Sequence, residues 1–245
     1  WSILANLDNK IQMSLFIDRL EKYKNLSNSF LMSRVPVVIE LELRNHKRLF
    51  KNLAKPFDEN LYSVLALAGL NFSTELHGFV FGFYSNNKYF FILRNDLTND
   101  SVPWLNNNIQ EIVSISSSIL TDKISVAQKI LNLPLNFKGD LTIKVSAWSA
   151  PNLAEIIQFI THEQVEAWKE SVQEAAFFHC SEIFDRKKAF KLLYQKPVEE
   201  KLKILKESCD IDFHSFYDQK FQTGTGYYKI PIMDPLTNTM RSKIY

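Results

Sequence analysis

Alternating hydrophobic and polar positions mark two strands of this chain. In the stretch VPVVIELEL, Ile39, Leu41 and Leu43 fall on one face, and Glu40 and Glu42 fall on the other. Because successive side chains of a strand point to opposite faces of a sheet, this alternation predicts a β-strand. The stretch DLTIKVSAW alternates in the same way and predicts a second strand.

Hydrophobic residues at a helical period predict three helices in the first part of the chain. The stretch KPFDENLYSVLALAGL has Pro and Asp at a helix start, followed by an apolar stripe. Residues 104–121 carry Ile, Val and Leu at the same spacing. Residues 15–27 place Phe16, Leu20 and Tyr23 at i, i+4 and i+7, which predicts a short amphipathic helix.

A hairpin completes the pattern. The runs GFVFGFY and KYFFIL are separated by Ser85-Asn86-Asn87, and asparagine is an ordinary turn residue because it tolerates the left-handed conformation. The resulting order, β-α-β-β-α-β, is the ferredoxin-like arrangement, also found in the palm of many nucleotidyl-transferring enzymes. We therefore expect an α+β fold: a palm-like, four-stranded antiparallel sheet with two helices on one face, and a C-terminal helical subdomain.

Beyond residue 150 the pattern becomes helical. The stretch EQVEAWKESVQEAAFF aligns Val165, Trp168, Val172 and Ala176 as one stripe, which predicts a buried helix face. Two further helices are predicted, and the tail QTGTGYYKIPIM is interpreted as a loop and an extended segment. We divide the chain into an N-terminal extension with its helix, a palm-like domain, and a helical subdomain with its tail, at residues 1–30, 31–150 and 151–245.

Composition narrows the class of protein. The 245 residues are 46% hydrophobic and 23% charged, which is typical of a globular chain with a sizeable core. A net charge of +2 excludes a global basic field, although not a local basic patch. No apolar run approaches the ~20 residues of a membrane span, and the start lacks a secretory signal pattern. We expect an intracellular protein, cytoplasmic or mitochondrial, without a membrane partner.

The cysteines and histidines show no spacing of a metal or catalytic site. Cys180 and Cys209 are far apart in sequence and form no CxxC motif, which predicts two reduced thiols. The five histidines lack ligand spacing such as His-x₃-His, so we predict no metal site from them. Cys180 follows His179, but adjacent helical positions point in different directions, which argues against a Cys-His nucleophile.

Five stretches carry a family pattern in matching order and spacing. They are FIDRLEKYK, ELELRNHKRLFKNLAKPFDE, HGFVFGFYSNNKYFFIL, EQVEAWKESV and DIDFHSFYDQKFQTGTGYYKIP. The set resembles the tRNA-His guanylyltransferase family, in particular its shorter guanylyltransferase-like branch, and Lys-Pro-Phe-Asp-Glu at 55–59 matches residue for residue. The resemblance runs from about residue 16 to residue 231. It implies a polymerase-like palm that adds nucleotides to the 5′ end of tRNA in the 3′-to-5′ direction.

The resemblance also implies a metal site. In active members, an Asp on the first strand and an Asp-Glu pair at the hairpin hold two Mg²⁺ ions; the matching positions here are Glu42, Asn87 and Lys88. An amide can offer one oxygen to a metal, whereas an ammonium cannot ligate one and repels it. We therefore expect a degenerate site without two-metal catalysis, and we name no catalytic residue. We also predict that Lys88 pairs with Glu42 in place of a metal.

Other positions also lack the residues that the family pattern has for contacts with the triphosphate. The Arg and Asp of the family's Trp-Arg-Gln-x-Asp motif match Glu163 and Glu166, although Lys169 keeps a cation at the later Arg position. Where the family has basic residues at the start of the second palm helix, this chain has Asn106–Asn108. These changes indicate that triphosphate contacts are lost while the scaffold is kept.

The resemblance and its lost ligands together imply a pseudoenzyme. We expect a non-catalytic subunit that binds and positions tRNA and assembles with a catalytic paralogue or with itself. We expect no cofactor. The residues predicted to contact RNA or phosphate are Lys47, Lys51, Lys55 and Lys169.

Two other interpretations stay open. An active but divergent 5′ nucleotidyltransferase would use Mg²⁺ with GTP or ATP, and would need Glu42 with other carboxylates, such as Asp96, or ligands from a neighbouring chain. An RNA- or nucleotide-binding regulatory module would have no enzymatic partner. The basic cluster FDRKKAFK, residues 184–191, is either a solvated face or a contact for RNA phosphate.

Overall fold

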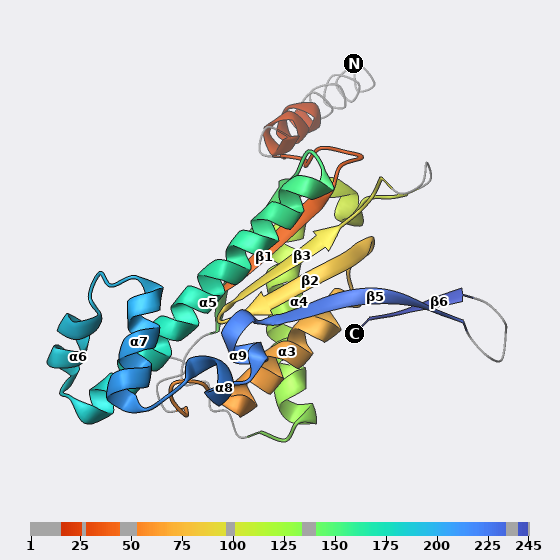
Figure 1. Cartoon of the computed structure of the whole chain (residues 1–245). Coiled ribbons are helices and arrows are strands. Elements are labelled where there is room, and N and C mark those ends of the chain that lie inside the picture. Colours follow the sequence, from red (N-terminus) through yellow and green to blue (C-terminus); the bar gives the residue numbers. More distant parts are fainter. Residues whose placement is uncertain are drawn as a thin grey trace, which may run out of the picture.

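The strands form one sheet. A computed structural model of the chain describes residues 16–25, 28–44, 53–96, 101–133, 141–233 and 240–244. Within these residues the strand order is β4-β1-β3-β2-β5-β6, and each neighbouring pair is antiparallel (Figure 1). The strands are β1 Val37–Arg44, β2 Phe79–Ser85, β3 Lys88–Leu93, β4 Thr142–Ser149, β5 Thr225–Met233 and β6 Met240–Ile244.

The first four strands confirm the predicted palm-like fold. Helix α3 (Glu59–Ser73) lies between β1 and β2 in sequence, and α4 (Ile109–Ile130) follows β3 after a short 3-10 turn. The order β4-β1-β3-β2 with these helices is the ferredoxin-like arrangement. Ile39, Leu41 and Leu43 are fully buried in the layer between the sheet and the two helices, as their alternation predicts.

The sheet is two strands larger than the sequence predicts. The C-terminal tail forms β5, which pairs with β2, and β6, which pairs with β5. Tyr227 of β5 joins the core: its ring lies parallel to that of Phe91, and its hydroxyl donates to the carbonyl of Ala66 at 2.9 Å. A Cβ added at Gly69 would lie 2.6 Å from that hydroxyl oxygen, so the close approach of α3 and β5 requires glycine there.

The long helix α5 (Leu153–Ile183) joins two layers. Its first half packs Ile156 and Ile160 against Val38 and Ile92 on the face of the sheet opposite α3 and α4. Its second half forms a separate apolar cluster with the C-terminal helices. These are α6 Arg186–Leu193, α7 Val198–Cys209 and α8 Phe213–Phe216, and α9 Gln219–Thr223 follows them.

The predicted buried stripe on α5 is correct in part. Val172 and Ala176 are fully buried and Trp168 is half-buried, whereas Val165 is 43% exposed. Val165 falls where the helix passes from the sheet to the helical cluster, and neither layer covers it. The helical period continues through this gap, so periodicity alone does not reveal it.

The two cysteines meet inside the helical cluster. The sulfur atoms of Cys180 and Cys209 lie 3.8 Å apart, and both thiols are free. Burial raises the pKa of the Cys180 thiol to about 12, which keeps it protonated and supports the prediction that it is no nucleophile. The separation of the two residues in sequence gave no sign of this contact.

The helix over residues 16–25 stands away from the other described residues (Figure 1). The sequence predicts an amphipathic helix at this position, and its apolar residues Phe16, Leu20 and Tyr23 are exposed. No described helix, this one included, is long and apolar enough to cross a lipid bilayer.

Replacing Tyr227 tests the addition of β5 to the sheet. Tyr227 is 3% exposed, so Tyr227→Ala should lower the free energy of unfolding by about 3–5 kcal/mol, since it leaves a cavity in the core. Tyr228→Ala is the matched control, because its side chain is 49% exposed and should cost about 1 kcal/mol or less. Urea unfolding measures both changes. Equal effects would contradict the assignment of the two faces of β5.

Candidate functional site

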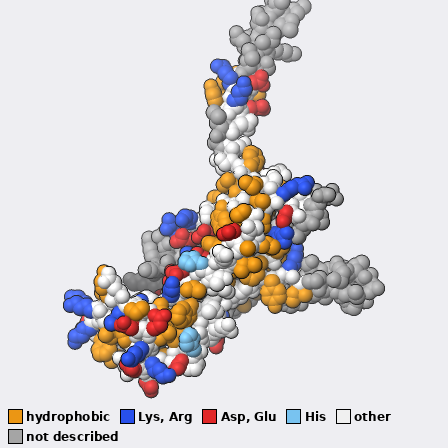
Figure 2. Space-filling model, turned by 45° about the horizontal axis from the view of Figure 1, so that its top comes forward, with side chains coloured by type: hydrophobic (Ala, Val, Ile, Leu, Met, Phe, Trp, Pro, Cys, Tyr) orange, Lys and Arg blue, Asp and Glu red, His pale blue; other side chains and the backbone are white. Residues whose placement is uncertain are grey.

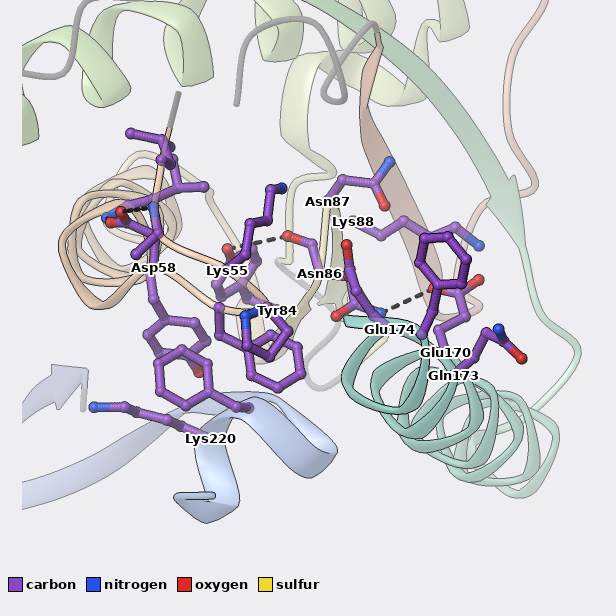
Figure 3. A pocket seen from close by; sticks show the side chains of 18 of the residues that line it. Lys55, Asp58, Tyr84, Asn86, Asn87, Lys88, Glu170, Gln173, Glu174 and Lys220 are labelled. Atoms are coloured by element: carbon purple, nitrogen blue, oxygen red, sulfur yellow. Dashed lines mark hydrogen bonds between the residues drawn. The ribbon is translucent and has the colours of Figure 1, made fainter. Parts of the chain in front are cut away.

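A pocket of about 570 Å³ opens at the end of the sheet where β1 stops and β2 turns into β3. Its walls come from this hairpin, the segment that leads into α3, the second half of α5, and α9 (Figure 3). All three degenerate metal positions, Glu42, Asn87 and Lys88, line it. The other charged residues described in its lining are Lys55, Lys220, Asp58, Glu170 and Glu174.

The hairpin turn is built by two asparagines. Ser85 pairs with Lys88, which leaves Asn86 and Asn87 as the turn. Asn86 has φ of 53°, a left-handed conformation that asparagine adopts at low cost. Its side-chain amide donates to a carboxylate oxygen of Glu170 at 2.9 Å, which ties the turn to α5. The prediction of ordinary turn chemistry for these residues agrees with this geometry.

Asn87 also has a structural role. Its side-chain amide donates to the carbonyl of Leu43 at 3.2 Å, and its own carbonyl accepts from the Leu43 amide at 2.8 Å. These bonds continue the pairing of β1 with β3 past the last register pair, Glu42 with Lys88. An aspartate could not donate the first of these bonds, so the amide at this position suits strand pairing better than metal ligation.

Lys88 makes an ion pair with α5 instead of with Glu42. Lys88 lies opposite Glu42 in the register, but its ammonium is 3.5 Å from a carboxylate oxygen of Glu163. The predicted Lys88–Glu42 pair is therefore wrong. The physical reason is that Glu42 already lies between two other cations, Arg44 and Lys144, each 3.8 Å from one of its oxygens. The Glu163 side chain is only 16% exposed, so solvent screens its charge less than that of a surface group.

The Lys88–Glu163 pair joins two positions that both depart from the family pattern. The resemblance implies an acid at position 88 and an arginine at position 163. The chain has Lys88 and Glu163, so both charges are reversed, and the two side chains contact each other across the hairpin and α5. Two changes that are far apart in sequence therefore compensate each other in space.

The residues present do not fit two Mg²⁺ ions. Mg²⁺ takes close-set oxygen ligands, and of the three family positions only Glu42 retains a carboxylate, flanked by the two cations described above. Among the described residues, no group of three or more His, Cys, Asp or Glu side chains is placed to hold a metal ion. We therefore derive no reaction step through a metal at this site.

Asp96 lies too far from the pocket to replace a lost ligand. It follows the end of β3 that is remote from Lys88, eight residues along the chain, which corresponds to roughly 25 Å of extended backbone. Its carboxylate receives two hydrogen bonds from Arg94, at 2.9 and 2.7 Å, and this pairing lowers the pKa of Asp96. The divergent active site that would use Asp96 finds no support in this geometry.

Of the four lysines predicted to contact RNA, the structure describes Lys55 and Lys169, and only Lys55 lines the pocket. Lys55 is exposed and lines the pocket. Lys169 donates to Glu166 at 2.7 Å on the surface of α5, which lowers the pKa of that carboxyl, and it is not part of the pocket lining. Lys47 and Lys51 lie outside the described residues.

Sequence reasoning missed one wall of the pocket. Phe57 and Phe221 are stacked with ring centroids 5.2 Å apart, and the ammonium of Lys220 lies 5.1 Å from the Phe221 ring centroid. Lys220 also pairs with Glu59, and the hydrogen bond that its ammonium donates to this carboxylate raises the pKa of Lys220. More than 150 residues separate the two rings in sequence, and no local pattern indicates that α9 returns to the start of α3.

Two of the three asparagines at Asn106–Asn108 hold the entry to α4. Asn107 and its two preceding residues have left-handed φ, and its side-chain amide donates to the carbonyl of Met32 at 3.3 Å. Asn108 is the N-cap of α4, and its side-chain oxygen accepts from the amides of Gln110 and Glu111. These roles explain asparagine where the family pattern has basic residues.

Comparisons with known proteins agree with this architecture. Residues 17–138, about half of the chain, match the model of the Thg1 family, described as tRNAHis guanylyltransferase. No curated protein sequence matches the chain. Among solved structures, the chain is similar to a bacterial tRNA(His) guanylyltransferase (Thg1)-like protein in complex with ATP, with 18% identity and a TM-score of 0.77 over 93% of this chain and 89% of that one.

Two further structures give the same result. A bacterial Thg1-like protein in complex with GTP has 19% identity and a TM-score of 0.71, with 94% of this chain and 89% of that chain covered. The tRNA(His) guanylyltransferase from Saccharomyces cerevisiae has 18% identity and a TM-score of 0.72, with 82% and 88% covered. At this level of identity the structures establish a shared fold.

Exchanging the two charges tests the Lys88–Glu163 pair. Lys88→Glu places a carboxylate beside Glu163 and should lower the free energy of unfolding by about 1 kcal/mol. Adding Glu163→Lys should recover most of this loss, with a coupling energy of about 0.5–1 kcal/mol in a double-mutant cycle. Adding Glu155→Lys, on the first turn of the same helix, is the control and should recover nothing. Equal recovery by both would show that the pair is not specific.

Proposed function

Because the chain belongs to the tRNAHis guanylyltransferase family, whose model matches residues 17–138, we propose that it is a tRNA-binding member whose palm pocket does not carry out metal-dependent nucleotide addition. In this role it is a non-catalytic subunit. It positions tRNA for a catalytic paralogue, or for another copy of the chain, in 5′-end addition or repair.

The reversed charge pair is the observation that carries this proposal. Lys88 stands where the family pattern has a metal-binding acid, and Glu163 holds its ammonium at 3.5 Å. A metal at this site would have to lie beside a fixed cation, which costs several kcal/mol at moderate effective dielectric. The ammonium of Lys88 also has a partner, so moving it away from the site would break an existing ion pair.

The charge of the neighbouring helix supports the same conclusion. Carboxylates on α5 follow at i, i+3, i+7 and i+11, and they line the space beside the hairpin: Glu163, Glu166, Glu170 and Glu174. Glu163 and Glu166 are paired with Lys88 and Lys169, whereas Glu170 and Glu174 line the pocket and would repel a triphosphate without metal ions. The α5 side of the pocket therefore disfavours the polyphosphate part of a nucleotide.

The folded scaffold supports a retained binding role. The palm layers, the hairpin and the C-terminal helices are all present, and the likeness to the bacterial and yeast structures extends over most of the chain. The family's name associates it with tRNA, and from this we take tRNA as the partner. Of the predicted phosphate contacts, Lys55 keeps an exposed position at the pocket and is the best placed.

Nucleotide addition by the pure chain tests this function. With Mg²⁺, GTP or ATP and a tRNA substrate, the chain should bind the tRNA but add no nucleotide to its 5′ end. Glu42→Ala should leave both results unchanged, because Glu42 is not used as a ligand. Addition that requires Mg²⁺ and is abolished by Glu42→Ala would contradict the proposal and establish the divergent enzyme instead.

A restoration variant sharpens the test. The triple change Asn87→Asp, Lys88→Glu and Glu163→Arg rebuilds the family's charges at the hairpin and on α5. If the scaffold is intact, this variant should gain Mg²⁺-dependent stabilisation of about 1.4 kcal/mol at a metal concentration ten times its dissociation constant, and the wild type should gain none. Equal stabilisation of both proteins in thermal unfolding would show that the changed residues do not control metal binding.

A further inference from the structure

Helix α6 has two different faces, and only one of them is packed against the rest of the protein. Ala189 and Leu193 are buried in the apolar cluster that α6 forms with α5, α7 and α8. Positions spaced i, i+3, i+4 and i+7 share one side of a helix. Four exposed residues have this spacing on the side away from the cluster, and we call them the α6 row: Lys187, Phe190, Lys191 and Tyr194.

The aromatic residues of the α6 row are exposed to solvent. Phe190 and Tyr194 are each 57% exposed, and their ring centroids lie 5.4 Å apart. In contrast, Phe213, an aromatic residue of the adjoining cluster, is only 2% exposed. Since Ala189 and Leu193 already anchor the helix, the core does not account for two rings on its outer side.

The described residues place no acidic partner beside three of the cations of α6. Among the described residues, no carboxylate lies within 4.0 Å of the charged groups of Arg186, Lys187 or Lys191, although Lys188 pairs with Asp185 at 3.9 Å. Neighbouring lysines on α7 are paired in the same way, Lys203 with Glu207 and Lys206 with Asp212. Figure 2 shows Lys and Arg side chains beside hydrophobic ones at the end of the molecule where Figure 1 places α6.

We propose that the α6 row binds unpaired nucleotides of RNA, with the two rings stacked on bases and the two lysines in contact with phosphates. Alternating cations and aromatic rings are the two components that bind single strands, since every base has a face for stacking and every linkage carries a charge. A duplex hides its base faces, so only unpaired nucleotides engage both components. This inference rests on the proposed function, because it gives the tRNA partner a second contact outside the palm pocket.

A membrane surface is the other partner that cations and aromatic rings can suit. Helices that lie in a membrane interface bury a continuous apolar face. The solvent side of α6 offers two rings interrupted by lysines, and the apolar residues Ala189 and Leu193 are committed to the protein core. The geometry therefore favours RNA, and the membrane becomes an outcome of the test.

Two double variants separate the two components. Binding of the full chain to a labelled tRNA, to a single-stranded RNA of 12 nucleotides and to the duplex form of that RNA is measured by fluorescence anisotropy over a range of salt concentrations. Lys187→Gln with Lys191→Gln should weaken single-strand binding and lower the slope of log K against log salt by about 1.4, because two phosphate contacts are lost. Phe190→Ala with Tyr194→Ala should weaken it by at least about tenfold and leave the slope unchanged.

The matched control removes two charges from the same subdomain. Lys203→Gln with Lys206→Gln deletes lysines that already pair with acids on or beside α7, so RNA affinity and salt slope should stay at the wild-type values. Circular dichroism melting confirms that each variant is folded, which is expected because every substituted side chain is largely exposed. Loss of binding in the control equal to that in the α6 lysine variant would overturn the proposal, since any two charges would then matter.

The outcomes distinguish this inference from the proposed function. A wild-type chain that binds the single strand through α6 but no tRNA would keep the inference and overturn the proposed function. Unchanged tRNA and single-strand binding in both α6 variants would overturn the inference and leave the proposed function standing.

Binding of the duplex as tightly as the single strand would contradict stacking of the two rings on bases and would overturn the inference. Binding to phosphatidylserine vesicles that the α6 variants lose, while RNA binding persists, would assign the α6 row to a membrane and overturn the inference.

Discussion

The register between β1 and β3 determines what this site can do. It places Glu42 opposite Lys88, and it is continued by the two hydrogen bonds between Asn87 and Leu43. The hairpin is thereby held against α5, where Glu163 receives the Lys88 ammonium and Glu170 receives the Asn86 amide. A palm that uses metals needs carboxylates converging at this point. Here the residues at this point are instead engaged in strand pairing, one reversed ion pair and one amide–carboxylate hydrogen bond.

The changes at the hairpin form a consistent set. A cation in place of an acid would destabilise a site whose neighbour on α5 was also a cation, and the chain has Glu163 at that neighbouring position. An amide in place of an acid would lose a metal ligand, and the chain uses the amide as a donor to the strand beside it. The scaffold around the site keeps the family's layers. These contacts hold the hairpin in place without a metal, which is the physical basis for proposing a binding subunit.

Local patterns in the sequence predicted the local structure well. The alternation around Ile39 and Leu41, the helical stripe of α3 and the asparagine turn all depend on neighbours along the chain, so composition and spacing suffice. Features that depend on distant segments were missed. The pairing of β5 with β2, the Phe57–Phe221 wall and the Cys180–Cys209 contact join segments about 30 to 165 residues apart. The partner of Lys88 was predicted on the adjacent strand because the competing charges around Glu42 and the reach to α5 appear only in three dimensions.

Anomalous scattering from crystals soaked in Mn²⁺ with GTP would test the central claim most directly, because Mn²⁺ replaces Mg²⁺ at oxygen-ligand sites and is located without ambiguity. The account predicts no anomalous peak within coordination distance of Glu42, with the Lys88 ammonium still on Glu163. Two peaks about 3.5–4 Å apart beside Glu42, with Lys88 displaced from Glu163, would contradict it, since that is the spacing of a two-metal site.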